Sequence, residues 1–99
     1  MIKRFDHVDI IIPKDGEDEA RQYYCGILGM REIEKPEILK KNGGLWLQLD
    51  GSQVHLSYEK KEGVDPRKTK AHLAFEVQSL QQLETELHRK GFQTKKNND

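Results

Sequence analysis

The chain has 99 residues, enough for one domain, and its 34% hydrophobic and 34% charged residues indicate a small core beneath a heavily charged surface. Its 17 Lys and Arg residues balance its 17 Asp and Glu residues, which argues against a general nucleic-acid-binding protein with a basic face. The longest apolar run, the isoleucines at positions 10–12, is too short for a membrane span, and the single cysteine, Cys25, excludes a disulfide within the chain.

A first strand is predicted over residues 5–13, where apolar side chains alternate with His7 and Asp9. A helix should follow over residues 17–28, because acidic residues fill its first turn, where the helix dipole favours them, and Gly29 can end it. The apolar stripe of this helix consists of Ala20, Tyr23, Tyr24, Ile27 and Leu28. We expect this stripe to cover the aliphatic face of the strand.

Three further strands are predicted before residue 60. A short strand covers residues 30–33, and two longer strands, 45–49 and 53–59, show the period-two alternation of a half-buried sheet. Asp50 and Gly51 between them are typical of a tight turn, so the two longer strands should form a β-hairpin.

The second half of the chain resembles the first in layout. A strand is predicted over residues 71–77, with His72 on the face away from its aliphatic side chains. A helix over residues 80–90 follows Ser79, a typical capping residue, and residues 92–95 could start another strand. The predicted order is therefore β-α-β-β-β followed by β-α-β.

Three histidines fall on the uncovered side of the predicted sheet: His7, His55 and His72. Taken singly, each is better interpreted as an ordinary strand residue facing solvent. A curved sheet would gather all three into a concave pocket, and neutral imidazoles are common metal ligands.

Six short motifs in this order and spacing resemble the vicinal oxygen chelate superfamily, which includes glyoxalases, bleomycin resistance proteins and dioxygenases. The motifs occupy residues 5–10, 20–24, 28–30, 43–46, 54–56 and 71–77. The resemblance implies an α+β fold in which paired βαβββ modules form a curved mixed sheet with helices on its outer face. Residues 1–60 would form the first module of a single glyoxalase-like domain, and residues 61–99 an incomplete second module.

The same resemblance implies a divalent metal, either Zn, Ni or Fe, bound by His7, His55 and His72. The fourth ligand of the family, a Glu on an eighth strand, has no counterpart before Asp99, so the chain is either shortened or the ordered part of a longer polypeptide. Glu76 lies about 13 Å along the strand from His72, too far for both to bind a metal at about 2 Å. Three histidines and a water would still make a sound metal site. Open strand edges in the incomplete module also predict a homodimer.

Other polar or aromatic residues are candidate substrate contacts, with ordinary outward-facing positions as the alternative. Trp46 would offer a flat wall, and Asp9 lies close enough to His7 to orient it or to contact a substrate. Arg67 precedes the predicted His72 strand and would meet an anionic substrate, unless its loop is simply solvated. The full set of candidate substrate contacts is Asp9, Trp46, Gln48, Glu59, Glu76 and Arg67.

We therefore predict a metal-dependent lyase or isomerase of the glyoxalase type, acting on a small metabolite with vicinal oxygens. One alternative is a non-catalytic antibiotic- or metabolite-binding protein of the bleomycin-resistance type, and another is a thiol transferase or dioxygenase. The expected partners are a small-molecule substrate and a second copy of the chain, with no nucleic acid and no membrane. Without a secretory signal pattern, the expected location is the cytoplasm.

Overall fold

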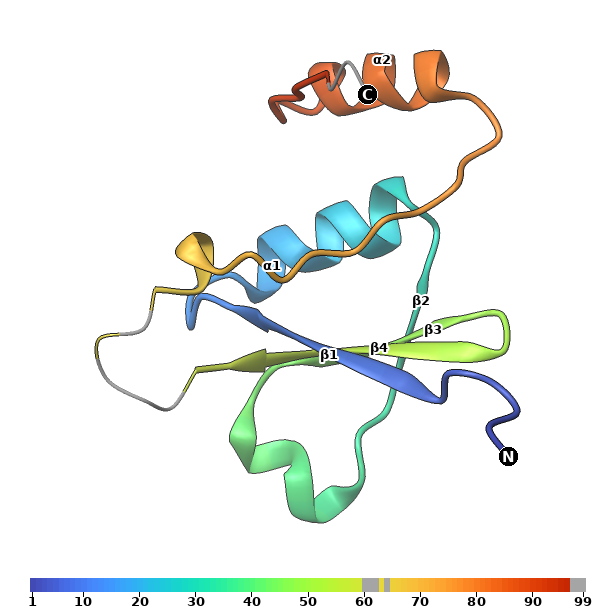
Figure 1. Ribbon diagram of the computed structural model, residues 1–99. Coiled ribbons are helices and arrows are strands. Elements are labelled where there is room, and N and C mark those ends of the chain that lie inside the picture. The colour runs from blue at the N-terminus through green and yellow to red at the C-terminus, as the bar shows by residue number, and fades with distance from the viewer. Residues whose placement is uncertain (60–62, 64, 97–99) are drawn as a thin grey trace.

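The structure is a computed structural model that describes residues 1–59, 63 and 65–96. Four strands form one mixed sheet in the order β1-β4-β3-β2 (Figure 1). The strands are β1 (His7–Ile12), β2 (Arg31–Ile33), β3 (Leu45–Leu49) and β4 (Ser52–Tyr58). β1 runs parallel to β4, and the other neighbouring strands are antiparallel. This mixed sheet with its helices confirms the predicted α+β class.

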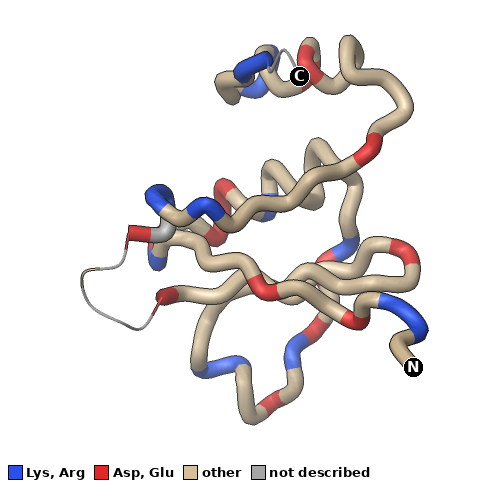
Figure 2. Tube along the Cα trace, in the orientation of Figure 1, with Lys and Arg blue, Asp and Glu red and all other residues tan. Residues whose placement is uncertain are grey.

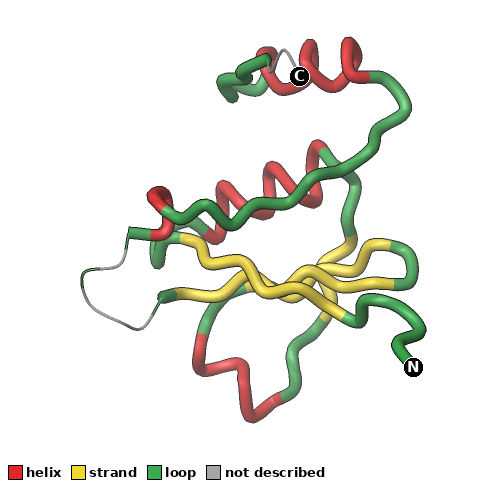
Figure 3. The backbone as a smooth tube through the Cα atoms, in the orientation of Figure 1, coloured by secondary structure: helices red, strands yellow, loops and turns green. Residues whose placement is uncertain are grey.

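A continuous helical segment covers one face of the sheet (Figure 3). It begins as α1 (Glu17–Ala20) and continues as a π-helix, η1 (Arg21–Ile27), in which the amide of Leu28 donates to the carbonyl of Tyr23. A short 3-10 helix, η2 (Glu37–Asn42), lies on the opposite side of the sheet (Figure 1). The face beside η2 is therefore free of the long helix, and we call it the open face.

Two further helices lie in the second half of the chain, η3 (Pro66–Lys68) and α2 (Leu80–Arg89). The predicted cap of α2 is confirmed, because the Ser79 side chain accepts a hydrogen bond from the amide of Gln82. None of the helices in the described ranges has the length and apolar character that a bilayer span requires.

The core lies between the sheet and the α1–η1 segment. Its buried side chains are Ile12, Ala20, Met30, Leu45, Leu47, Val54 and Leu56. The strand residues in this set alternate with side chains on the open face, as the sequence predicted. Charged residues of both signs are spread over helices, loops and strand ends (Figure 2).

The N-terminal turn of α1 is tied to the sheet by Glu17. One carboxylate oxygen of Glu17 accepts a hydrogen bond of 3.0 Å from the amide of Gly44, immediately before β3. The other oxygen pairs with Arg21, which also contacts Glu32 on β2. These contacts fix the start of β3, and therefore the position of Trp46, relative to the helix.

The prediction of strands over residues 71–77 and 92–95 is wrong, since neither segment is a strand in the structure. The chain between η3 and α2 runs on the helix side of the sheet (Figure 1), and Leu73 within it packs against the core. A strand needs a neighbour to pair its backbone groups, and among the described residues this segment pairs with no strand of the sheet. The predicted boundary between the modules, at residue 60, lies outside the described residues.

Candidate functional site

Three aromatic rings from three neighbouring strands form a continuous stack on the open face. The ring of His55 on β4 lies between His7 of β1 and Trp46 of β3, with centroid separations of 4.2 Å and 3.9 Å. The interplanar angles are 15° and 2°, so all three planes are nearly parallel. The stack arises because Trp46 is the direct cross-strand partner of His55, and His7 projects from the same face of β1.

The two imidazoles are held by hydrogen bonds at their edges. Nδ1 of His7 lies 2.9 Å from a carboxylate oxygen of Asp6, and Nε2 of His55 lies 2.8 Å from the side-chain oxygen of Gln53. Because that amide oxygen can only accept, Nε2 of His55 carries the proton and Nδ1 keeps its lone pair in the neutral ring.

His55 is buried by the two rings that flank it, with 7% of its surface exposed. Burial is the main cause that lowers its pKa, and the nearby charge of His7 lowers it further, while Asp9 and Asp6 act in the opposite direction. His55 is therefore neutral at pH 7 and can accept a hydrogen bond from a bound molecule.

This lowered pKa predicts that acid destabilises the fold. The unfolded chain takes up a proton on His55 near pH 6.5, whereas the folded chain resists it until the pH is lower. The free energy of unfolding should thus fall as pH falls from about 7.5 through 6.5. Urea denaturation at a series of pH values measures this slope. The slope should be shallower in His55→Leu, and an unchanged slope in that variant would contradict the assignment.

The structure does not bring His72 to the other two histidines. His72 is exposed in the segment between η3 and α2, and its Nδ1 lies 2.8 Å from the carbonyl of Lys70. That segment runs on the helix side of the sheet (Figure 1), whereas His7 and His55 belong to the ring stack on the open face.

The residues as placed do not fit a metal ion. The lone pairs of two stacked, nearly parallel imidazoles lie in separate planes and cannot both point at one ion about 2 Å away. Over the described residues, no group of three or more His, Cys, Asp or Glu side chains could hold a metal. Metal binding by His7, His55 and His72 would require both a rotation of rings and a different course for the His72 segment.

The predicted substrate contacts divide into two groups. Asp9, Trp46 and Gln48 lie on the open face, where both carboxylate oxygens of Asp9 accept from the Ser57 hydroxyl at 2.8 Å. The remaining three lie elsewhere: Glu59 directly follows β4, Glu76 is exposed before α2, and Arg67 in η3 pairs with Asp65.

Sequence reasoning missed Gln53, Asp6 and Ser57 as members of this site. Gln53 and Ser57 flank His55 at a spacing of two along β4, so they share its face, and this alternation was available from the sequence. Asp6 is adjacent to His7 along the chain, but its contact depends on how the residues before β1 turn.

Comparisons with known proteins agree with this fold. A family model described as the Glyoxalase/Bleomycin resistance protein/Dioxygenase superfamily matches residues 4–97. A solved structure of a glyoxalase family protein from Bacillus anthracis is 36% identical, with a TM-score of 0.74, and the match covers 92% of this chain and 72% of that one. No curated protein matches the chain.

Two more distant structures share the fold alone. The integron cassette protein HFX_CASS4, from the mobile metagenome of the Halifax Harbour sewage outfall, is 21% identical with a TM-score of 0.63, over 91% of this chain and 72% of its own. SMU.1112c is 18% identical with a TM-score of 0.61, over 92% of this chain and 77% of its own.

Proposed function

Because this chain belongs to the glyoxalase/bleomycin resistance protein/dioxygenase superfamily, we propose that it binds a small planar molecule on the open face of its sheet. Members of this superfamily typically bind small molecules. The observation that carries the proposal is the stack of Trp46, His55 and His7. A planar ligand can extend such a stack at the His7 end, which lies on the edge strand β1 and is half exposed, since parallel aromatic faces attract one another beyond simple burial of area.

Polar groups beside the stack fit a ligand that carries oxygen atoms. The amide of Gln53 keeps donors available after its oxygen has accepted from His55, and the neutral ring of His55 keeps an acceptor at Nδ1. Asp9 and Ser57 add a carboxylate and a hydroxyl on the same face. Vicinal hydroxyl or carbonyl groups on a flat molecule match this combination.

The single tryptophan, Trp46, makes the site directly observable. We expect catechol to change Trp46 fluorescence saturably, and trans-cyclohexane-1,2-diol, which has the same two oxygens but no flat ring, to bind about tenfold more weakly. His55→Leu should reduce catechol affinity by about tenfold. His88→Ala, a histidine on α2 away from the stack, should leave it unchanged. Equal affinity for the two diols would contradict ring stacking.

The metal-dependent lyase or isomerase predicted from the sequence is the second candidate. It is supported by the neutral state of His55, the form of imidazole that binds a metal, and it requires the rings of His7 and His55 to rotate out of their stack. The same titration distinguishes the candidates when Zn²⁺ is added. If catechol bound only when Zn²⁺ was present, and His72→Ala abolished this Zn²⁺-dependent binding, the metal site would be established and the metal-free binding site overturned.

We also propose that the chain forms a homodimer through β1. Within the described residues, β1 has a strand neighbour on one side only, and the nearby side chains of Phe5 and Val8 are 83% and 38% exposed. An open strand edge with apolar side chains tends to recruit another strand, and a two-fold axis would pair it with β1 of a second copy. Sedimentation velocity tests this pairing, and a monomeric mass at every concentration would contradict it.

A further inference from the structure

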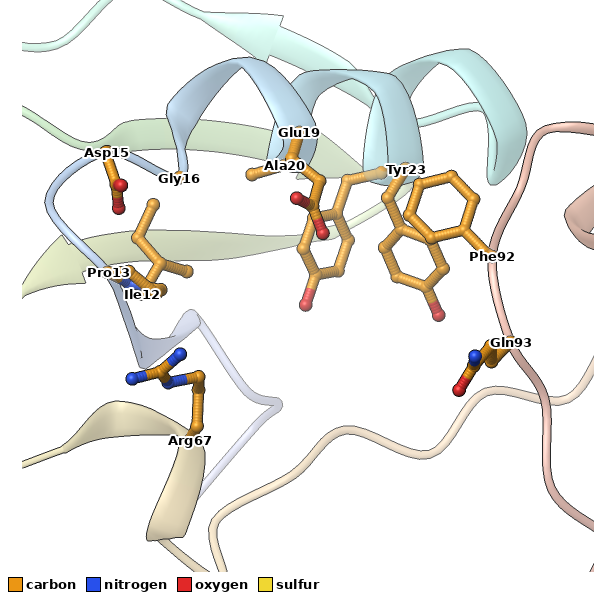
Figure 4. A pocket seen from close by; sticks show the side chains of 11 residues that line it. Ile12, Pro13, Asp15, Gly16, Glu19, Ala20, Tyr23, Arg67, Phe92 and Gln93 are labelled. Carbon is orange, nitrogen blue, oxygen red and sulfur yellow. The ribbon is translucent and has the colours of Figure 1, made fainter.

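A cavity lies on the helix side of the sheet, away from the ring stack, and we propose that it binds an organic cation with an apolar body. Its volume is about 840 Å³, which is within the range of small-molecule sites. It opens between the α1–η1 segment, the end of β1 and the residues that follow α2 (Figure 4). The residues of the open-face site do not line this cavity.

One wall of the cavity is aromatic. Tyr23 meets Tyr24 edge to face with ring centroids 4.8 Å apart, and Tyr23 lies 5.7 Å from the ring of Phe92 (Figure 4). The faces of such rings carry negative charge density and attract ammonium groups. Tyr24 is half-buried, and burial raises the pKa of its phenol, so it stays neutral and offers a ring and a hydroxyl.

The charged side chains of the cavity favour a cation over an anion. Asp15 and Glu19 line it with carboxylates, and in the described part of the chain Glu19 has neither a hydrogen bond nor an ion pair (Figure 4). Arg67 is the one cationic side chain among its lining residues, and Asp65, 3.1 Å away, already offsets that charge. Lys14 lines a smaller neighbouring cavity of about 500 Å³ that also contains Arg67 and Asp65.

These features together define the ligand class. An apolar body fills a space beside Tyr23, Tyr24 and Phe92, and a substituted ammonium group sits between the rings and the carboxylates. An aromatic carboxylate carries the same negative charge as Asp15 and Glu19 and is repelled by them, and a neutral alcohol gains no charge attraction from them. Selectivity for positive charge is therefore the property that distinguishes this site from a general apolar pocket.

Benzyltrimethylammonium, benzoate and benzyl alcohol are the probes for this site, because they share a ring and differ in charge. We expect saturable binding of the cation, followed by amide chemical shifts in ¹H–¹⁵N spectra at Glu19, Tyr23 and Phe92. The other two probes should bind about tenfold more weakly. Trp46 fluorescence should not respond, which separates this site from the open face. Equal binding of all three probes, or shifts confined to other residues, would overturn the proposal.

Two variants refine the test without altering the core. Glu19→Gln should weaken binding of benzyltrimethylammonium by about fivefold, because it removes an unpaired carboxylate from the cavity. Asp18→Asn makes the same change of charge on the preceding residue, whose side chain is fully exposed and does not line the cavity. It should leave the affinity unchanged. An equal loss in both variants would indicate long-range attraction and not a built site.

Discussion

Gly44→Ala is expected to lower the free energy of unfolding by about 3 kcal/mol, because two penalties coincide at this position. Gly44 has φ of 85°, a conformation that residues with a Cβ rarely adopt. A Cβ at this position would also overlap the backbone carbonyl oxygen of Leu56 in β4. The backbone cannot yield cheaply there, because the amide of Gly44 is held by Glu17 and β3 begins at the next residue.

Two other glycines separate these penalties. Gly29 also has a positive φ, 81°, but a Cβ there meets nothing within 4 Å, so Gly29→Ala should cost only about 1 kcal/mol. Gly51 has neither a positive φ nor a close neighbour, and Gly51→Ala should change stability by less than about 0.5 kcal/mol. Urea denaturation of the three variants measures these losses in the free energy of unfolding. A loss in Gly44→Ala no greater than in Gly29→Ala would exclude the clash with β4.

The first half of the fold was predictable because its signals are local. Period-two alternation located β1, β3 and β4, and the acidic first turn and apolar stripe located the helix that starts at Glu17. These patterns act within a few residues and do not depend on distant partners. They also placed His7, His55 and Trp46 on one face, which is the basis of the candidate site.

The second half shows where local pattern fails. Residues 71–77 alternate as a strand does, yet a strand forms only when another strand can pair with it, and that partner is not encoded in the segment itself. The same limit applies to His72. Its assignment to the site assumed that residues 71–77 form a strand of the same curved sheet, and in the structure this segment lies on the helix side of the sheet (Figure 1).

The chemistry of the site was only partly predictable for a related reason. Alternation gives the face of each residue, but ring stacking depends on register, and the parallel pairing of β1 with β4 joins residues far apart in sequence. That register places Asp9 beside His55 and lets the ring of His7 reach it. The stacking explains why His55 is buried and neutral, a property that favours ligand binding through aromatic faces and hydrogen bonds.

Leu47→Ala is expected to lower the free energy of unfolding by about 3 kcal/mol, because Leu47 is completely buried at the centre of the sheet. Its neighbours Leu45 and Leu56 are also fully buried, so the surroundings cannot collapse readily into the space left by three lost carbon atoms. A domain of this size is stabilised by only about 5–15 kcal/mol, so the variant should unfold at a much lower urea concentration.

Leu49→Ala is the matched control for this prediction. Leu49 lies on the same strand and the same face, but its side chain is 41% exposed, and its truncation should cost less than about 1 kcal/mol. Because Trp46 is adjacent to Leu47, fluorescence of the folded variant also reports whether the ring stack survives the cavity. Similar losses of stability in Leu47→Ala and Leu49→Ala would mean that β3 does not cross the centre of the core. The ring stack on its opposite face would then lack the rigid support that ligand binding requires.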